Sequence, residues 1–206
     1  MTGFVEAVAG SVEVELERLG SQKSLLALTR ADLSPEAVLT VAAASERAAR
    51  ETFAAWADDE ADPDAAAAFA DLAAREADHY ERVVAELDGG EPPPSDPDPM
   101  QARLRECEAT AERLGGLAGR TLVADRTLLQ VVNFFVNEAD ERRADLFREL
   151  RAETEPALDV ATDHLEGRDE ASRERARAAA VDVVRAAYGE YADALEGMGV
   201  DPRPVC

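Results

Sequence analysis

The sequence predicts an all-α fold, and three observations support this prediction. Apolar residues recur at the helical period of about 3.6 residues along most of this alanine-rich chain. Gly and Pro residues divide the chain into helix-sized segments. No segment shows the alternation of apolar and polar residues that is typical of a half-buried strand. We therefore expect one all-α domain over residues 1–206, a length that is ample for a continuous core.

The individual helices follow from start and stop signals along the chain. An N-terminal helix is expected within residues 1–30, from about Phe4 to Thr29, with a break at Gly20. Ser34-Pro35 and Asp62-Pro63 each place a capping side chain before a proline, which predicts helix starts. These two helices end near residues 59 and 88. Further helices are predicted over about 100–120, 125–150, 156–167 and 169–197, and those after residue 154 form a C-terminal segment, 154–206.

The charge of the chain excludes several classes of partner. Asp and Glu number 44 against 22 Lys and Arg, which gives a formal charge of −22. Nucleic acids and anionic membrane surfaces are polyanions, so neither is an expected partner. Lys23 is the only lysine. Excess acid with almost no lysine suggests a halophilic protein, because molar salt screens the self-repulsion of such a chain.

Cysteine content and hydropathy indicate a protein of the cytoplasm. The two cysteines, Cys107 and Cys206, form no C-x-x-C motif, so neither a disulfide framework nor a Cys₄ metal site is expected. Glutamates interrupt the first twenty residues, which argues against a secretory signal. No apolar run approaches the roughly 20 residues that a membrane span needs.

The residues that could carry chemistry interrupt the apolar faces of predicted helices. Glu76 and His79 form an E-x-x-H motif, which places both side chains on one helix face. That face otherwise consists of apolar residues, and Glu46 lies in a similar stripe on the preceding helix. Glu138 and Glu141 continue the pattern near Phe134. A buried carboxylate needs a partner, so a shared cation is the favoured explanation. A buried polar network and a surface location remain the alternatives.

A weak internal repeat pairs these residues in two halves. Ala44-Ser45-Glu46-Arg47 begins a unit that contains the E-x-x-H motif, and Thr110-Ala111-Glu112-Arg113 begins one that contains Glu138-x-x-Glu141. Two stacked helical hairpins of this kind make a four-helix bundle over residues 34–150. Gly115, Gly116 and Gly119 follow Glu112 and are expected to permit close helix approach, since no strand precedes them to make a phosphate loop.

The pattern L39-x-x-A42-x-x-x-E46-x-x-A49, followed by F69-x-x-L72-A73-x-x-E76-x-x-H79, resembles the first half of a rubrerythrin-like member of the ferritin-like superfamily. The resemblance covers residues 36–90 well and 100–150 poorly. It implies a carboxylate-bridged site of one or two iron ions, with manganese or zinc as alternatives. The implied ligands are Glu46, Glu76, His79, Glu138, Glu112, and Glu141 in place of the family's second histidine.

The resemblance also implies a crossover between the second and third helices of the bundle. Residues 91–99, EPPPSDPDP, form the only clear linker. If the ligands of both halves lie at the same height along the bundle axis, the end of the second helix and the start of the third helix must be roughly 33 Å apart. Residues 89–99 reach about 34 Å as an extended polyproline helix. The second and third helices are therefore expected to be parallel.

Two main hypotheses for function remain open at this point. The first is a rubrerythrin-like metal-binding protein that reduces peroxide or oxidises ferrous iron. Because no rubredoxin domain is present, its electrons would come from a separate donor. The second is a metal-free ferritin-like scaffold that acts as an interaction or regulatory module. A helical maturation chaperone or antitermination-like regulator is a third reading that the fold class allows. A homo-oligomer, a dimer, is expected. In the scaffold case the N-terminal helix and the helix over residues 169–197 either wrap the bundle or form the homodimer face.

Overall fold

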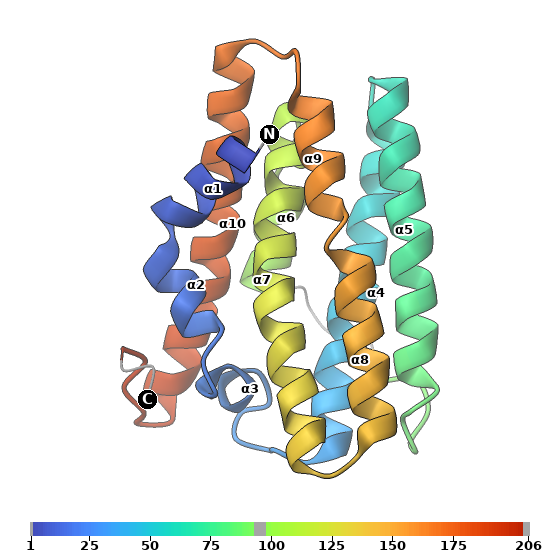
Figure 1. Ribbon diagram of the computed structural model, residues 1–206, viewed down its shortest axis with the longest axis vertical. Coiled ribbons are helices and arrows are strands. Elements are labelled where there is room, and N and C mark those ends of the chain that lie inside the picture. Colours follow the sequence, from blue (N-terminus) through green and yellow to red (C-terminus); the bar gives the residue numbers. More distant parts are fainter. Residues whose placement is uncertain (1, 93–97, 204–206) are drawn as a thin grey trace.

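The computed structural model describes residues 2–92 and 98–203. All regular structure in these ranges is helical, which confirms the predicted fold class (Figure 1). The helices are α1 (Thr2–Ser11), α2 (Glu13–Leu19), α3 (Lys23–Leu28), α4 (Pro35–Asp59), α5 (Pro63–Val84), α6 (Pro99–Arg105), α7 (Thr110–Asn137), α8 (Glu141–Thr154), α9 (Ala157–Leu165) and α10 (Glu170–Gly197). Within the described ranges, no helix is both long enough and apolar enough to cross a membrane.

The predicted starts of α4, α5 and α10 are confirmed by side-chain caps. Ser34 Oγ accepts a hydrogen bond from the Ala37 backbone N–H, and Asp62 Oδ1 accepts from the N–H groups of Asp64 and Ala65. Asp169 caps α10 in the same way. Such caps satisfy amide groups that have no partner within the helix, and each stabilises the helix by about 1 kcal/mol.

The long helices run lengthwise side by side in the molecule (Figure 1). α4 and α5 form a close antiparallel hairpin, α7 packs closely against both α8 and α10, and α1–α3 cover part of α7 and α10. α5 and α7 run in the same direction, opposite to α4 and α8. A crossover between α5 and α7 requires this arrangement. Residues 93–97 of the expected crossover 89–99 lie outside the described residues.

The helix bounds predicted between residues 100 and 150 are wrong, because the structure has α6, α7 and α8 in place of the two expected helices. The expected break between residues 120 and 125 does not exist, because α7 runs unbroken from Thr110 to Asn137. The chain turns instead at Ala139, whose φ of 58° is unusual for a residue other than glycine. In the N-terminal segment the expected break at Gly20 is confirmed, because α2 ends at Leu19 and Gly20 is its C-terminal cap, but the further break after Ser11 was not expected.

The glycines of α7 allow close packing against α10, as predicted. A Cβ atom added to Gly115 would lie 2.0 Å from the Ala176 carbonyl oxygen, and one added to Gly119 would lie 2.5 Å from the Ala180 carbonyl oxygen. The two helix backbones therefore touch at these positions. α10 is thus part of the core of the molecule and packs along α7.

The apolar core consists of two clusters. The larger cluster contains Phe53, Trp56 and Phe69 together with residues of α7 and α10. The smaller cluster contains Phe135 and Phe147, whose rings stack with centroids 5.6 Å apart, together with residues of α4, α5, α7 and α8. α4, α5 and α7 contribute to both clusters, and the buried polar residues described next come from these same three helices.

Candidate metal centre

Glu46, Glu76 and His79 lie together in the interior of the helix bundle. Glu46 comes from α4, whereas Glu76 and His79 come from adjacent turns of α5. Their exposed fractions are 3 %, 0 % and 0 %. One potential ligand atom from each lies within 4.8 Å of those of the other two, so this group could hold a metal ion. The prediction that these three residues share a buried site is therefore confirmed.

Arg120 of α7 supplies a positive charge to the same cluster. Its guanidinium group donates two hydrogen bonds to the two carboxylate oxygens of Glu76, at 3.0 and 2.8 Å. The same group lies 3.5 Å from Glu46 Oε2 and over the ring of Phe53. Arg120 is only 2 % exposed. A bidentate pair of this kind is among the stronger polar contacts in proteins, and here water does not compete with it.

His79 has one nitrogen with a hydrogen-bond partner and one without. Nε2 lies 2.9 Å from Glu153 Oε2, and Arg82 also donates a hydrogen bond to this oxygen. Because an ionised carboxylate only accepts, Nε2 carries a proton. Nδ1 faces Glu46 Oε2 at 3.9 Å, and both of these buried atoms lack a hydrogen-bond partner. A distance of 3.9 Å is too long for a hydrogen bond between them.

The two buried carboxyl groups titrate as a pair. Burial raises the pKa of Glu76 to about 7, against the lowering effect of Arg120. Burial also opposes ionisation of Glu46, but His79, Glu76 and Arg120 together lower its pKa to about 2. Two ionised carboxylates in one buried site repel each other, so the state in which only one of the two is ionised is favoured over the state in which both are.

The carboxylates also act on the imidazole of His79. Burial alone would lower the pKa of His79, but Glu46, Glu76 and Glu153 raise it above its ordinary value. A metal ion at Nδ1 would have to displace the proton that these carboxylates favour.

The structure does not bring the other three predicted ligands to this cluster. Glu138 is the exposed C-terminal cap of α7, and Glu141 is exposed in the first turn of α8. Glu112 accepts hydrogen bonds from the backbone N–H groups of Glu108 and Ala109 at the start of α7. The reason is the unbroken α7, which puts Glu138 at a helix end rather than in mid-helix. Within the described residues, the metal-ligand grouping contains Glu46, Glu76 and His79 alone.

Sequence reasoning missed Arg120 and Glu153. Arg120 stands among small and apolar residues, in the segment Gly115–Val123, and an isolated charge in such a segment is a detectable signal. It is also the buried cation that the glutamates require. Glu153 gives no comparable signal, because acidic residues are frequent throughout α8 and its side chain is 44 % exposed.

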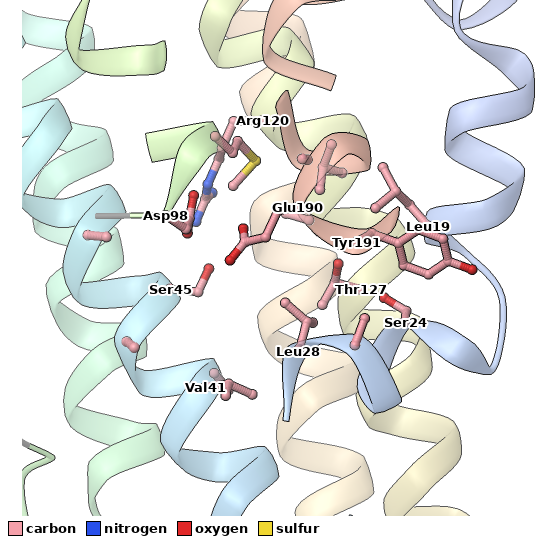
Figure 2. Close-up of a pocket in the computed structure, with 18 of the residues that line it drawn as sticks. Leu19, Ser24, Leu28, Val41, Ser45, Asp98, Arg120, Thr127, Glu190 and Tyr191 are labelled. Carbon is pink, nitrogen blue, oxygen red and sulfur yellow. The ribbon is translucent and has the colours of Figure 1, made fainter. Parts of the chain in front are cut away.

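A cavity of about 490 Å³ adjoins the cluster. Glu46 and Arg120 both line it, so the cavity leads to the buried site. Exposed residues, among them Leu28 and Glu51, also line it, which opens the cavity to solvent. Figure 2 shows the side chain of Glu190 reaching from α10 into this space.

Glu190 should make the stability of the protein depend on pH. Burial and the negative charge of Asp98 raise its pKa from 4.5 to about 7, while Arg30 acts in the opposite direction. A raised pKa in the folded state gives a contribution that is complete below pH 4.5 and lost as the pH rises through 7. Between about pH 5 and pH 8 we expect a loss of about 1 kcal/mol in the free energy of unfolding, a value reduced for partial exposure of the side chain.

Urea unfolding of the wild type, Glu190→Gln and Glu196→Gln at both pH values measures this loss. Glu196 is an exposed carboxylate on the same helix and serves as the control. The loss should be smaller by about 1 kcal/mol in Glu190→Gln than in the other two proteins, because all three share the contribution of Glu76, whose pKa is also raised to about 7. Equal losses in all three proteins would contradict the assignment to Glu190.

Comparison with protein-family models, with curated proteins and with solved structures finds no match to this chain.

Proposed function

We propose that this chain is a rubrerythrin-like metal-binding protein that holds one divalent transition-metal ion between Glu46, Glu76 and His79. The observation that carries this proposal is that two buried atoms without hydrogen-bond partners, Glu46 Oε2 and His79 Nδ1, face each other at 3.9 Å, with the Arg120 guanidinium group 3.5 Å from the glutamate oxygen. Two atoms bound to one metal at about 2.1 Å lie roughly 3–4 Å apart. A single ion between them would satisfy both.

The groups around the three ligands support the proposal. Glu153 accepts a hydrogen bond from His79 Nε2, so Nδ1, once it has released its proton, directs its lone pair toward Glu46. A carboxylate behind a histidine is the usual arrangement for fixing the orientation of a metal ligand. Glu76 uses both oxygens with Arg120, but each carboxylate oxygen has a second lone pair that can reach a metal.

A dinuclear site does not fit the residues that surround the cluster. The resemblance requires carboxylates from the second half of the bundle, and Glu112, Glu138 and Glu141 lie elsewhere. α7 contributes the Arg120 guanidinium group at that place. One imidazole and two carboxylates suit iron(II) or manganese(II), with zinc(II) as the third choice. When bound, such an ion supplies redox or Lewis-acid chemistry, consistent with the proposed reduction of peroxide or oxidation of ferrous iron by electrons from a separate donor.

Metal analysis of protein prepared anaerobically in molar KCl tests the proposal. We expect close to one equivalent of iron or manganese in the wild type and a loss of at least tenfold in Glu76→Ala/His79→Ala. The control is Glu138→Ala/Glu141→Ala, which removes two exposed carboxylates and should retain the metal. Circular dichroism establishes that each variant is folded. A count near two would contradict the single-ion site.

Arg120 favours a second candidate function, the metal-free scaffold. Its guanidinium group already neutralises the carboxylates of the cluster, so the interior contains a cation without any metal. Folded wild-type protein that remains free of metal under these conditions would decide for this second candidate.

A further inference from the structure

The cavity beside the metal centre has a polar end with excess negative charge. Glu190 of α10 points toward Ser45 of α4 and toward Asp98, which precedes α6 (Figure 2). Among the described residues, Glu190 forms neither a hydrogen bond nor an ion pair, and Asp98 has no ion pair, its Oδ1 accepting from the Gln101 backbone N–H. Glu46, at 3 % exposure, lines the same cavity, and its Oε2 has no hydrogen-bond partner.

The arginines that line the cavity do not balance this charge. Arg105 pairs with Glu51 at 3.1 Å, and Arg120 pairs with Glu76. Arg47 donates a hydrogen bond to the Pro92 carbonyl oxygen and has further contacts. These arginine side chains are therefore engaged elsewhere, and the effects of burial and of the neighbouring acid Asp98 on Glu190 outweigh that of Arg30, which does not line the cavity.

Most of the remaining cavity wall is apolar, with the hydroxyl groups of Ser24 and Thr127 among the apolar side chains. The apolar residues come mainly from α3, α4 and α7, with others from α2, α6 and α10, and include Leu25, Leu28, Val41, Leu128 and Val131. Figure 2 shows Leu28 and Val41 on the side of the cavity away from Arg120. The volume of about 490 Å³ lies within the range of small-molecule sites in proteins. An apolar wall with a few convergent charged groups is the usual composition of such a site.

We propose that this cavity binds an organic ammonium ion with an apolar body, its positive group between Glu190 and Asp98 and its body against the residues of α3, α4 and α7. The ammonium group would donate hydrogen bonds to two acids that form no ion pair among the described residues. A neutral or anionic molecule of the same shape would leave the two acids unpaired. This inference goes beyond the proposed metal site and does not depend on it.

Calorimetric titration with n-octylammonium tests the proposal. The protein is the full chain, freed of metal by a chelator, in molar KCl at about pH 8, where Glu190 is ionised. We expect one bound ammonium per chain, with an affinity at least tenfold higher than that of 1-octanol and of octanoate. Octanol binding as tightly as the ammonium would overturn the ionic part of the proposal, and an absence of binding by the ammonium would overturn all of it.

Two variants on the same helix identify the recognising group. Glu190→Gln should weaken binding of octylammonium by about tenfold or more and leave the weak binding of octanol unchanged. Glu196→Gln removes an equal charge from an exposed position of α10 and should bind like the wild type. An equal effect of both variants would show attraction by net charge alone and would overturn the proposal.

A further measurement separates this inference from the metal proposal. His79→Ala should lose the metal and still bind octylammonium. If the wild type contains no metal but binds the ammonium, only the metal proposal fails. If it contains metal and does not bind the ammonium, only this inference fails.

Discussion

Replacing Glu76 by leucine in the metal-free protein is expected to lower the free energy of unfolding by about 3–5 kcal/mol. The variant leaves Arg120, which is 2 % exposed, without the two hydrogen bonds that it donates to Glu76. A buried charge that loses its partner retains its full desolvation cost, and arginine cannot release its proton to avoid it. Urea unfolding at about pH 8 in molar KCl measures the change.

The double variant Glu76→Leu/Arg120→Met makes this prediction specific. It replaces the Glu76–Arg120 pair by apolar side chains, so it should recover part of the stability lost by Glu76→Leu alone, while Glu46 loses the cation 3.5 Å away and keeps His79 as a neighbour of opposite charge. The matched control is Glu138→Leu, which changes an exposed carboxylate and should alter stability by no more than about 0.5 kcal/mol. If Glu76→Leu lost less than about 1 kcal/mol, the Arg120 pair would not be the main charge balance of the interior.

Replacing Gly115 by alanine is expected to destabilise the protein by about 3 kcal/mol. The new Cβ atom would lie 2.0 Å from the Ala176 carbonyl oxygen, which belongs to the backbone of α10 and cannot rotate away. α7 and α10 would have to separate along their contact. Gly119→Ala should cost somewhat less, because its Cβ would lie 2.5 Å from the Ala180 oxygen. Gly116→Ala should cost least, since its nearest neighbour is a movable Leu104 side chain at 2.9 Å.

Gly189→Ala on α10 provides the control for this series. An added Cβ there meets no atom within 4 Å, so the substitution should stabilise the helix by about 0.5–1 kcal/mol. Thermal unfolding monitored by circular dichroism measures all four variants under one condition. Equal effects of Gly115→Ala and Gly189→Ala would contradict the close backbone contact between α7 and α10.

The sequence predicted the first half of the site because its signals are local. Ser34 and Asp62 fix the starts of α4 and α5, and the helical period then places Glu46, Glu76 and His79 on buried faces. The second half depends on where α7 ends, and that end is a left-handed turn at Ala139. Glycine is the residue usually found at such a turn, so an alanine at this position does not predict the end of a helix.

The partner of the buried glutamates could not be read from the repeat. The search for matching carboxylates led to Glu112, Glu138 and Glu141, whereas the neutralising group in the structure is the arginine at position 120. A buried acid requires positive charge but does not specify its source. Only the packing of α7 against the α4–α5 hairpin shows that a guanidinium group reaches Glu76.

The ionic cluster also has a consequence for how the helices align along their length. The faces of α4 and α5 are rich in alanine, and small, uniform side chains offer little shape to prevent one helix from sliding along another. A slide of one helical turn would move Arg120 about 5.4 Å away from Glu76 and bury both charges unpaired. We expect the Glu76–Arg120 pair to fix the position of α7 along α5, and so to select one register from several that apolar packing alone would allow.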